Sequence, residues 1–275
     1  MKNILLPFEY QDTIAHIVDC AMYIAEQHNS NVSGLAIHQR IDSFIAQEGS
    51  IIFDNFNNDE NLNMPTKYKE NFSKEIKLQI KKNKNLKNIK RFWLSEELQN
   101  QKFLGDISRI YDLVIVSRPY QELQSASLSS IQTILFDGGR PVLLIPMNKK
   151  VEIGRNVLIS WNCTTESSRA VFASLPILKK AKKVTILTVE KVITHGPSGQ
   201  EVSDMLKTHG VTAEVVTMQS EQKMIGNTIL DFAKSNNIDL IIKGAYTQSR
   251  LREIIFGGVT KHLMLHSDIP IFLVN

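Results

Sequence analysis

Apolar runs and helical patterns alternate along the chain, and the alternation starts again near its middle. The segment NILLPFEYQDT from Asn3 is echoed by NVLISWNCTTES from Asn156, and each passes from an apolar run to polar turn residues. Helical periodicity follows each run, over 14–27 and over 168–180. A second apolar run comes next, NVSGLAIH in the first half and KVTILTVE in the second. The pattern therefore predicts a β-α-β unit at the start of each half.

The ends of the two halves correspond as well. The run YDLVIVS matches IDLIIKG, RPVLLIP matches IPIFLVN, and IKRFWLS and TAEVVTM supply a third run in each half. Continuous apolar runs are typical of strands buried on both faces of a parallel sheet. Five such strands alternating with helices in each half predict an α/β fold of two tandem, doubly wound, five-stranded parallel-sheet domains.

Charged and polar segments divide this pattern. The segment MNKKVEIGR at 147–155 is charged and poor in apolar residues, as an exposed linker should be, so we place one domain at 1–148 and the other at 149–275. An insertion at 41–65 in the first half is rich in Asn, Asp and Ser. It predicts a long loop, either a lid or a solvated excursion without a role.

Composition narrows the classes of function. The formal net charge of +4 is small for 275 residues, and much of the excess lies in the lysine-rich segment 74–91. In and just before that segment Phe72, Ile76 and Ile80 fall in line among lysines, which predicts an amphipathic helix with a solvated face rather than a nucleic-acid interface. No apolar run approaches the roughly twenty residues that span a bilayer, so we expect no membrane contact and a cytoplasmic location.

Candidate ligand-binding residues follow the first and fourth strands of the second half. Parallel sheets bind ligands beyond the carboxyl ends of their strands, where the strand order reverses. There the chain carries SWNCTTES from Ser160 and GAYTQSRLREIIFGGVTKH from Gly244. Glycines permit close backbone approach, and a helix N-terminus after Gly258 favours phosphate. The residues alone leave two interpretations open: a phosphate-binding loop, or glycines that only end a strand and begin a helix.

The second of these segments resembles the signature of the universal stress protein family. In that signature a glycine after the fourth strand is followed by two residues, a second glycine, nine residues, and then glycine with Ser or Thr. Gly244 and Gly257 match the first and third glycines, whereas Thr247 stands at the second and Gly258 replaces the hydroxyl residue. The following VTKHLMLHSDIPIFLV is similar to the closing helix and strand of the family. The resemblance implies a Rossmann-like fold of the adenine nucleotide alpha hydrolase type.

The resemblance also implies a function and a site. Family members of the nucleotide-binding kind hold ATP or a related adenine nucleotide beside an aspartate at the end of the first strand, where this chain has Asn162 in the second half and Glu9 in the first. No metal is implied beyond Mg²⁺ that accompanies the nucleotide. The implied nucleotide-binding residues are Ser160, Trp161, Asn162, Val189, Gly244, Ala245, Thr247, Arg250, Gly257, Gly258, Val259 and Thr260.

Assembly and action follow from the same resemblance. It implies an internal pseudo-dimer in which RPVLLIP and IPIFLVN meet, and it leaves a homodimer of two chains open. We expect a stress-response protein that acts through conformation or partner binding, with at most weak ATP hydrolysis. The alternative is a nucleotide-free interaction scaffold of the same fold, because Asn162, Thr247 and Gly258 depart from the family pattern.

The sequence lacks the motifs that other nucleotide-binding or metal-binding sites require. The first half carries SRPYQELQSASLSS where the glycine loop is expected, and Pro119 supplies no N–H there, so this half is predicted to be a structural partner. The sequence has no GxxxxGK[ST] loop and no GxGxxG fingerprint. His262 and His266 have metal-ligand spacing without a third ligand, and the two cysteines, Cys20 and Cys163, have none.

Overall fold

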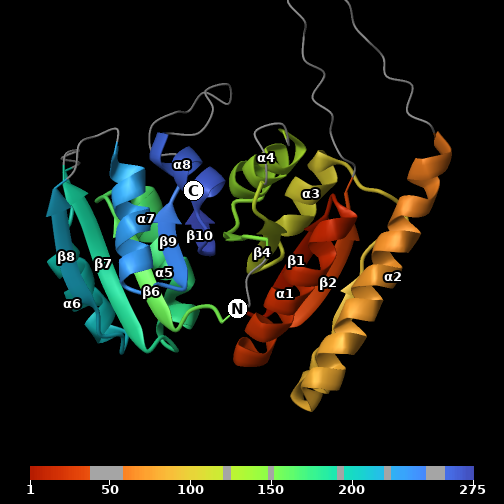
Figure 1. The fold of residues 1–275 in the computed structure, drawn as a ribbon, viewed down its shortest axis with the longest axis horizontal. Coiled ribbons are helices and arrows are strands. Elements are labelled where there is room, and N and C mark those ends of the chain that lie inside the picture. The colour runs from red at the N-terminus through yellow and green to blue at the C-terminus, as the bar shows by residue number, and fades with distance from the viewer. Residues whose placement is uncertain (38–57, 120–124, 148–151, 191–194, 220–223, 246–257) are drawn as a thin grey trace, which may run out of the picture.

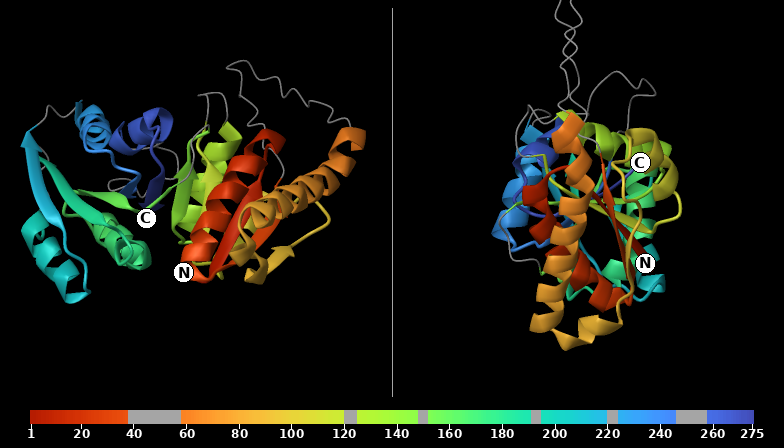
Figure 2. Two further views of the ribbon diagram at one scale, coloured as in Figure 1. Left: turned by 60° about the horizontal axis from the view of Figure 1, so that its bottom comes forward. Right: turned by 90° about the vertical axis from the view of Figure 1, so that its right-hand side faces the viewer.

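The fold is one continuous ten-stranded sheet covered by helices. A computed structural model describes residues 1–37, 58–119, 125–147, 152–190, 195–219, 224–245 and 258–275. The strand order is β3-β2-β1-β4-β5-β10-β9-β6-β7-β8, so the strands of the two halves lie side by side along the sheet (Figures 1 and 2). The first half supplies β1 (Asn3–Phe8), β2 (Asn31–Ala36), β3 (Arg91–Trp93), β4 (Leu113–Ser117) and β5 (Val142–Ile145). The second supplies β6 (Asn156–Trp161), β7 (Lys183–Glu190), β8 (Glu214–Gln219), β9 (Leu240–Gly244) and β10 (Ile271–Val274).

The two halves repeat one topology. All strand pairs within each half are parallel, and the order of the five strands in one half mirrors the order in the other. The predicted α/β fold with two doubly wound parallel-sheet units is therefore confirmed. The other four strands of each half are mostly buried, whereas β3 and β8 at the sheet edges are partly exposed.

Helices cover both faces of the sheet. One face is covered by α1 (Ile14–His28), α2 (Asn58–Lys82), α5 (Thr165–Leu178) and α6 (Gly199–Thr208). The other is covered by α3 (Gln101–Ser108), α4 (Ser125–Gln132) with the π-helical turn η3 (Thr133–Asp137), α7 (Ile225–Ser235) and α8 (Gly258–His266). Short 3₁₀ turns η1 (Gln11–Thr13) and η2 (Lys84–Asn88) precede α1 and follow α2. We call these the α5 face and the α8 face of the sheet.

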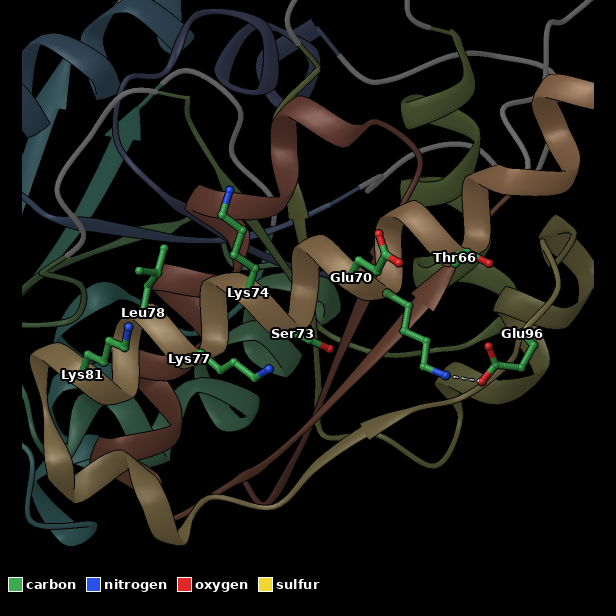
Figure 3. Close-up of a pocket in the computed structure, with 9 residues that line it drawn as sticks. Thr66, Glu70, Ser73, Lys74, Lys77, Leu78, Lys81 and Glu96 are labelled. Atoms are coloured by element: carbon green, nitrogen blue, oxygen red, sulfur yellow. Dashed lines mark hydrogen bonds and ion pairs between the residues drawn. The ribbon is translucent and has the colours of Figure 1, made fainter.

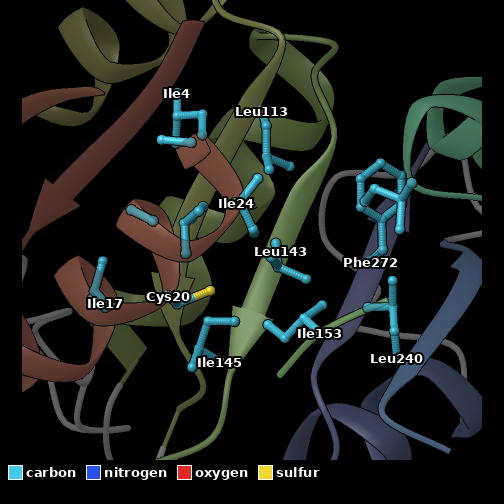
Figure 4. Packing of buried hydrophobic residues seen from close by; sticks show 14 of the residues in the cluster. Ile4, Ile17, Cys20, Ile24, Leu113, Leu143, Ile145, Ile153, Leu240 and Phe272 are labelled. Atoms are coloured by element: carbon cyan, nitrogen blue, oxygen red, sulfur yellow. The ribbon is translucent and has the colours of Figure 1, made fainter. Parts of the chain in front are cut away.

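The halves join through their last strands. β5 and β10 pair antiparallel, with Leu143 opposite Phe272, and both side chains are fully buried in the core of the α5 face (Figure 4). This is the pairing that the family resemblance implies for an internal pseudo-dimer. A further link is the guanidinium of Arg118, which donates to the carbonyl of Leu265 in α8 at 2.8 Å. The core is thus continuous across the junction.

A matched pair of aspartates fixes the start of the first strand in each half. Asp112, just before β4, accepts hydrogen bonds from the backbone N–H groups of Lys2 and Asn3 at 2.6 and 2.9 Å. Asp239, just before β9, accepts from the N–H groups of Gly154, Arg155 and Asn156 at 2.8–3.1 Å. The duplicated sequence therefore repeats a tertiary contact as well as a strand pattern.

The insertion at 41–65 is only partly described. Its last residues belong to α2, which begins at Asn58 and includes Pro65, so the prediction of a loop is wrong there. The polar composition of the insertion predicted a loop, but the helix is stabilised by its later residues. Tyr68, Phe72 and Ile76 are buried against the sheet and α1. Residues 41–57 lie outside the described residues.

The lysine-rich segment matches its prediction over the part that is helical. Phe72 and Ile76 face the core, and Lys74, Lys77 and Lys81 are exposed on the other side of α2. Beyond α2 the segment continues through η2 into β3. Within the described ranges of the chain, no helix combines the length and the apolar character that a membrane crossing requires.

Candidate functional site

The carboxyl ends of β6 and β9 form the switch point of the second half. These strands are neighbours, with Ser160 opposite Lys243. After β6 the chain enters α5 on one face, and after β9 it continues towards α8 on the other face. Connections that leave adjacent strands for opposite faces open a crevice at the strand ends, which is where such folds bind ligands. Those expected site residues that the structure describes are taken in turn below, starting from this point.

Side chains in the turn from β6 into α5 form hydrogen bonds with one another and with the first turn of the helix. Asn162, which stands at the family's aspartate position, accepts a hydrogen bond through Oδ1 from the hydroxyl of Thr164 at 3.0 Å. Thr164 caps α5 and forms a capping box with Ser167. Cys163 has a positive φ of 62° at this turn. Asn162 is half-buried, and its amide nitrogen forms none of the hydrogen bonds found among the described residues, so it is available to a ligand as a donor.

Gly244 is required by packing on the α5 face. A Cβ at this position would collide with the backbone nitrogen of Ser167 and would lie 2.9 Å from Cβ of Glu166. Its φ is not in the left-handed region. The first turn of α5 therefore rests directly on the end of β9. The sequence suggested close approach of a ligand at Gly244, and the structure supplies close approach of a helix instead.

Trp161 belongs to the core of the α5 face. Its indole is buried, and Nε1 donates to the carbonyl of Pro197 at 2.8 Å. A Cβ on the neighbouring Gly196 would lie 2.6 Å from the carbonyl oxygen of Cys163. The segment after β7 thus packs closely over the end of β6, and only the backbone of Trp161 is left to meet a ligand.

The remaining expected residues that the structure describes differ in exposure. Val189 is half-exposed and packs on this face, whereas Ala245 is buried and its N–H donates to Val274 at 2.8 Å. Gly258 is exposed at the start of α8, and a Cβ there would meet nothing within 4 Å. Val259 is half-buried and Thr260 is buried. Three further expected residues lie outside the described residues: Thr247, Arg250 and Gly257.

Lys243 is a feature of the site that sequence reasoning missed. Its side chain is on the α8 face, because Ile241 and Ala245 two residues away belong to the core of that face. It is only 5% exposed, and burial lowers the pKa of its ammonium from 10.5 to about 8. The signal was a single lysine inside the apolar run LIIKGA, where a strand buried on both faces should carry none.

The corresponding strand ends in the first half are filled by side chains of that half. Glu9, directly after β1, is buried, and its carboxylate accepts a hydrogen bond from the hydroxyl of Ser130. Ser130 also accepts from the side-chain amide of Gln101 at 2.8 Å. His16 Nε2 lies 3.2 Å from the hydroxyl of Ser117 at the end of β4. These hydrogen bonds tie α1, α3 and α4 to the carboxyl ends of β1 and β4 in the first half.

A groove of about 560 Å³ lies elsewhere, along α2 (Figure 3). Its lining includes the lysines 69, 74, 77 and 81, and Lys69 pairs with Glu96 at 2.5 Å. These are side chains of one solvated helix face, in the first half and away from the β6 and β9 ends. We therefore assign the candidate site by the switch point and not by this groove.

Metal ligands are not gathered in the described parts of the chain. No group of three or more His, Cys, Asp or Glu side chains there is placed to hold an ion. The rings of His262 and His266 lie 4.5 Å apart, and burial together with the neighbouring His266 lowers the pKa of His262. His262 packs against Gly226 of α7. His262 therefore takes part in the packing of α8 against α7, whereas His266 is exposed.

Comparison with known proteins agrees with this architecture. Residues 166–275 match the model of the universal stress protein family. The matched residues run from α5 to the end of the second half. The stress response protein NhaX of Bacillus subtilis (strain 168) is 33% identical over 79 residues, which cover 25% of this chain and 48% of that protein. The match therefore spans about half the length of this curated relative.

Solved structures of universal stress proteins share the whole fold. One from Archaeoglobus fulgidus DSM 4304 superposes with a TM-score of 0.69 at 14% identity, covering 99% of this chain and 96% of that chain. A putative universal stress protein from Pseudomonas aeruginosa UCBPP-PA14 gives 0.57 at 12% identity, covering 100% and 93%. At these identities the likeness shows the fold alone, and it covers both halves of the chain.

Proposed function

We propose that this chain is a stress-response protein whose second half binds ATP or a related adenine nucleotide. Occupancy of the site would change the conformation of the protein or its choice of partners. The observation that carries the proposal is the contrast between the two switch points. Glu9, Ser130 and Gln101 close the first, whereas in the second α8 begins at an exposed Gly258 beside the ends of β6 and β9.

The chemistry of the second switch point suits a nucleotide. The N-terminus of α8 offers unpaired backbone N–H groups and a partial positive charge to phosphate. The amide nitrogen of Asn162 can donate to a base or a ribose hydroxyl. No triad or pair of placed carboxylates is assigned to the site, so hydrolysis would be weak. The proposal includes domains at 1–148 and 149–275, with the first as a structural partner, a homodimer of two chains, and a cytoplasmic location.

Two measurements test the proposal. Purified protein is denatured and its supernatant examined by mass spectrometry for adenine nucleotides, and nucleotide-free protein is titrated with ATP, AMP and GTP by calorimetry. We expect adenine nucleotide to bind with one site per chain, and GTP to bind more weakly. A clean supernatant with no heat of binding at millimolar ATP would refute nucleotide binding.

The second candidate is a nucleotide-free interaction scaffold. Two contacts favour it. The side-chain oxygen of Asn162 already accepts a hydrogen bond from Thr164, and the indole N–H of Trp161 already donates to the carbonyl of Pro197. A scaffold would retain its partner regardless of nucleotide. Pull-down experiments with and without ATP separate the two functions, because only the first predicts that bound partners change.

A further inference from the structure

Lys243 is buried where the strand pattern demands an apolar residue. Its neighbours in register are Ser160 on β6 and Leu273 on β10. Neither carries a charge, and no charged group shifts its pKa, which is lowered by burial alone. None of the hydrogen bonds or ion pairs between described residues uses its ammonium. Such a group costs folding free energy unless something of opposite charge meets it.

The internal repeat shows that the fold does not need this lysine. IDLIIKG of the second half aligns with YDLVIVS of the first, which places Val116 at the position of Lys243. Val116 is buried on the same face of β4, in the same core cluster as Ile241. A valine therefore serves the packing role in an equivalent strand. The lysine must be explained by something that only the second half does.

The position of Lys243 connects it to the start of α8. It is the penultimate residue of β9, on the face that α8 covers. The buried residues Thr260, Leu263 and Met264 show which side of α8 faces the sheet, and Thr260 is in the first turn. Because α8 begins at the carboxyl edge of the sheet, its N-terminus and the end of β9 lie at the same edge on the same face. A lysine side chain can extend along apolar surface and present its ammonium at that edge.

We propose that Lys243 is a phosphate-binding residue of the site, and that its ammonium pairs with the polyphosphate of the nucleotide at the N-terminus of α8. This inference rests on the proposed function and names the group that binds its charged part. The family pattern has a hydroxyl residue at the position of Gly258, and a glycine removes that contact. The Lys243 ammonium, at the same edge and on the same face of the sheet, would supply a charge-assisted contact in its place.

The test is calorimetric titration of the full chain with ATP, adenosine and inorganic tripolyphosphate. Lys243→Met and Lys243→Val are compared with the wild type, the second because valine occupies the equivalent position in the first half. Lys234→Met, an exposed lysine of α7, is the matched control. We expect both Lys243 variants to bind ATP and tripolyphosphate about tenfold or more weakly, with adenosine binding unchanged and the control unaffected. Circular dichroism verifies that each variant is folded.

The outcomes separate this inference from the proposed function. If the wild type binds ATP and both Lys243 variants bind it equally well, the role of Lys243 is refuted while nucleotide binding stands. If the wild type binds tripolyphosphate but not ATP, and the variants lose that binding, Lys243 is an anion-binding residue and the adenine nucleotide proposal fails. If the wild type binds neither, both are refuted.

Discussion

Replacing Lys243 by Met should stabilise the protein in a way that depends on pH. Burial lowers the pKa of this ammonium from 10.5 to about 8, so the folded state holds the proton less tightly than the unfolded chain does. Each pKa unit corresponds to about 1.4 kcal/mol, and the charged lysine therefore costs the nucleotide-free protein about 3 kcal/mol of unfolding free energy. The cost is fully present below pH 8, where the residue is protonated in both states.

The sign of the pH dependence follows from the direction of the shift. As pH rises from about 8 to 10.5, the folded protein loses the proton first, and the wild type regains stability at up to about 1.4 kcal/mol per pH unit. Methionine has a similar shape and does not titrate, so Lys243→Met lacks this rise. Its advantage over the wild type should be about 3 kcal/mol at pH 7 and should shrink steadily above pH 8.

Urea denaturation from pH 6.5 to 10, without nucleotide, measures this difference. The difference in unfolding free energy between the variant and the wild type is taken at each pH, because the contributions of other titrating groups then cancel. Lys234→Met serves as the control, since Lys234 is exposed and should give a difference near zero at every pH. A stability difference that stays constant between pH 8 and 10, or a variant less stable than the wild type at pH 7, would refute the reasoning.

Three further substitutions have defined outcomes. Gly258→Ser should tighten ATP binding about tenfold without loss of stability, because a Cβ there meets open space and the hydroxyl adds a phosphate contact; unchanged calorimetric affinity would place the phosphates elsewhere. Gly244→Ala should cost about 1–3 kcal/mol in denaturant unfolding because it pushes α5 off β9, and a neutral result would contradict the packing role. Asp239→Ala should lower unfolding free energy by about 2 kcal/mol because three backbone donors lose their acceptor, whereas the exposed Asp231→Ala should have little effect; equal losses would contradict the assignment.

The fold could be predicted from sequence because its evidence is periodic and duplicated. Matched apolar runs specify buried strands, and five of them per half leave few topologies. The helix in the last part of the 41–65 insertion was not predicted, because α2 is stabilised by the burial of Tyr68, Phe72 and Ile76 later in the helix. That is a tertiary effect, which local composition does not reveal. Polar composition therefore predicted the wrong element for 58–65.

Sequence alone was enough to propose a candidate site, but not to predict how its residues pack. The strand ends and Gly258 are found by pattern, yet the purpose of Gly244 depends on how closely α5 approaches β9, which only the fold determines. The same holds for Trp161, whose partner Pro197 is a loop residue far along the chain. Lys243 was visible as an irregularity in an apolar run, but its burial without a partner required the structure.

The central claim is that one of the two switch points binds an adenine nucleotide and the other does not. Calorimetric titration of nucleotide-free protein with ATP tests it most directly, since the stoichiometry counts the sites. We predict one ATP per chain, with the affinity reduced by Lys243→Met and unaffected by Glu9→Gln. Two sites per chain, or none at millimolar ATP, would contradict the account.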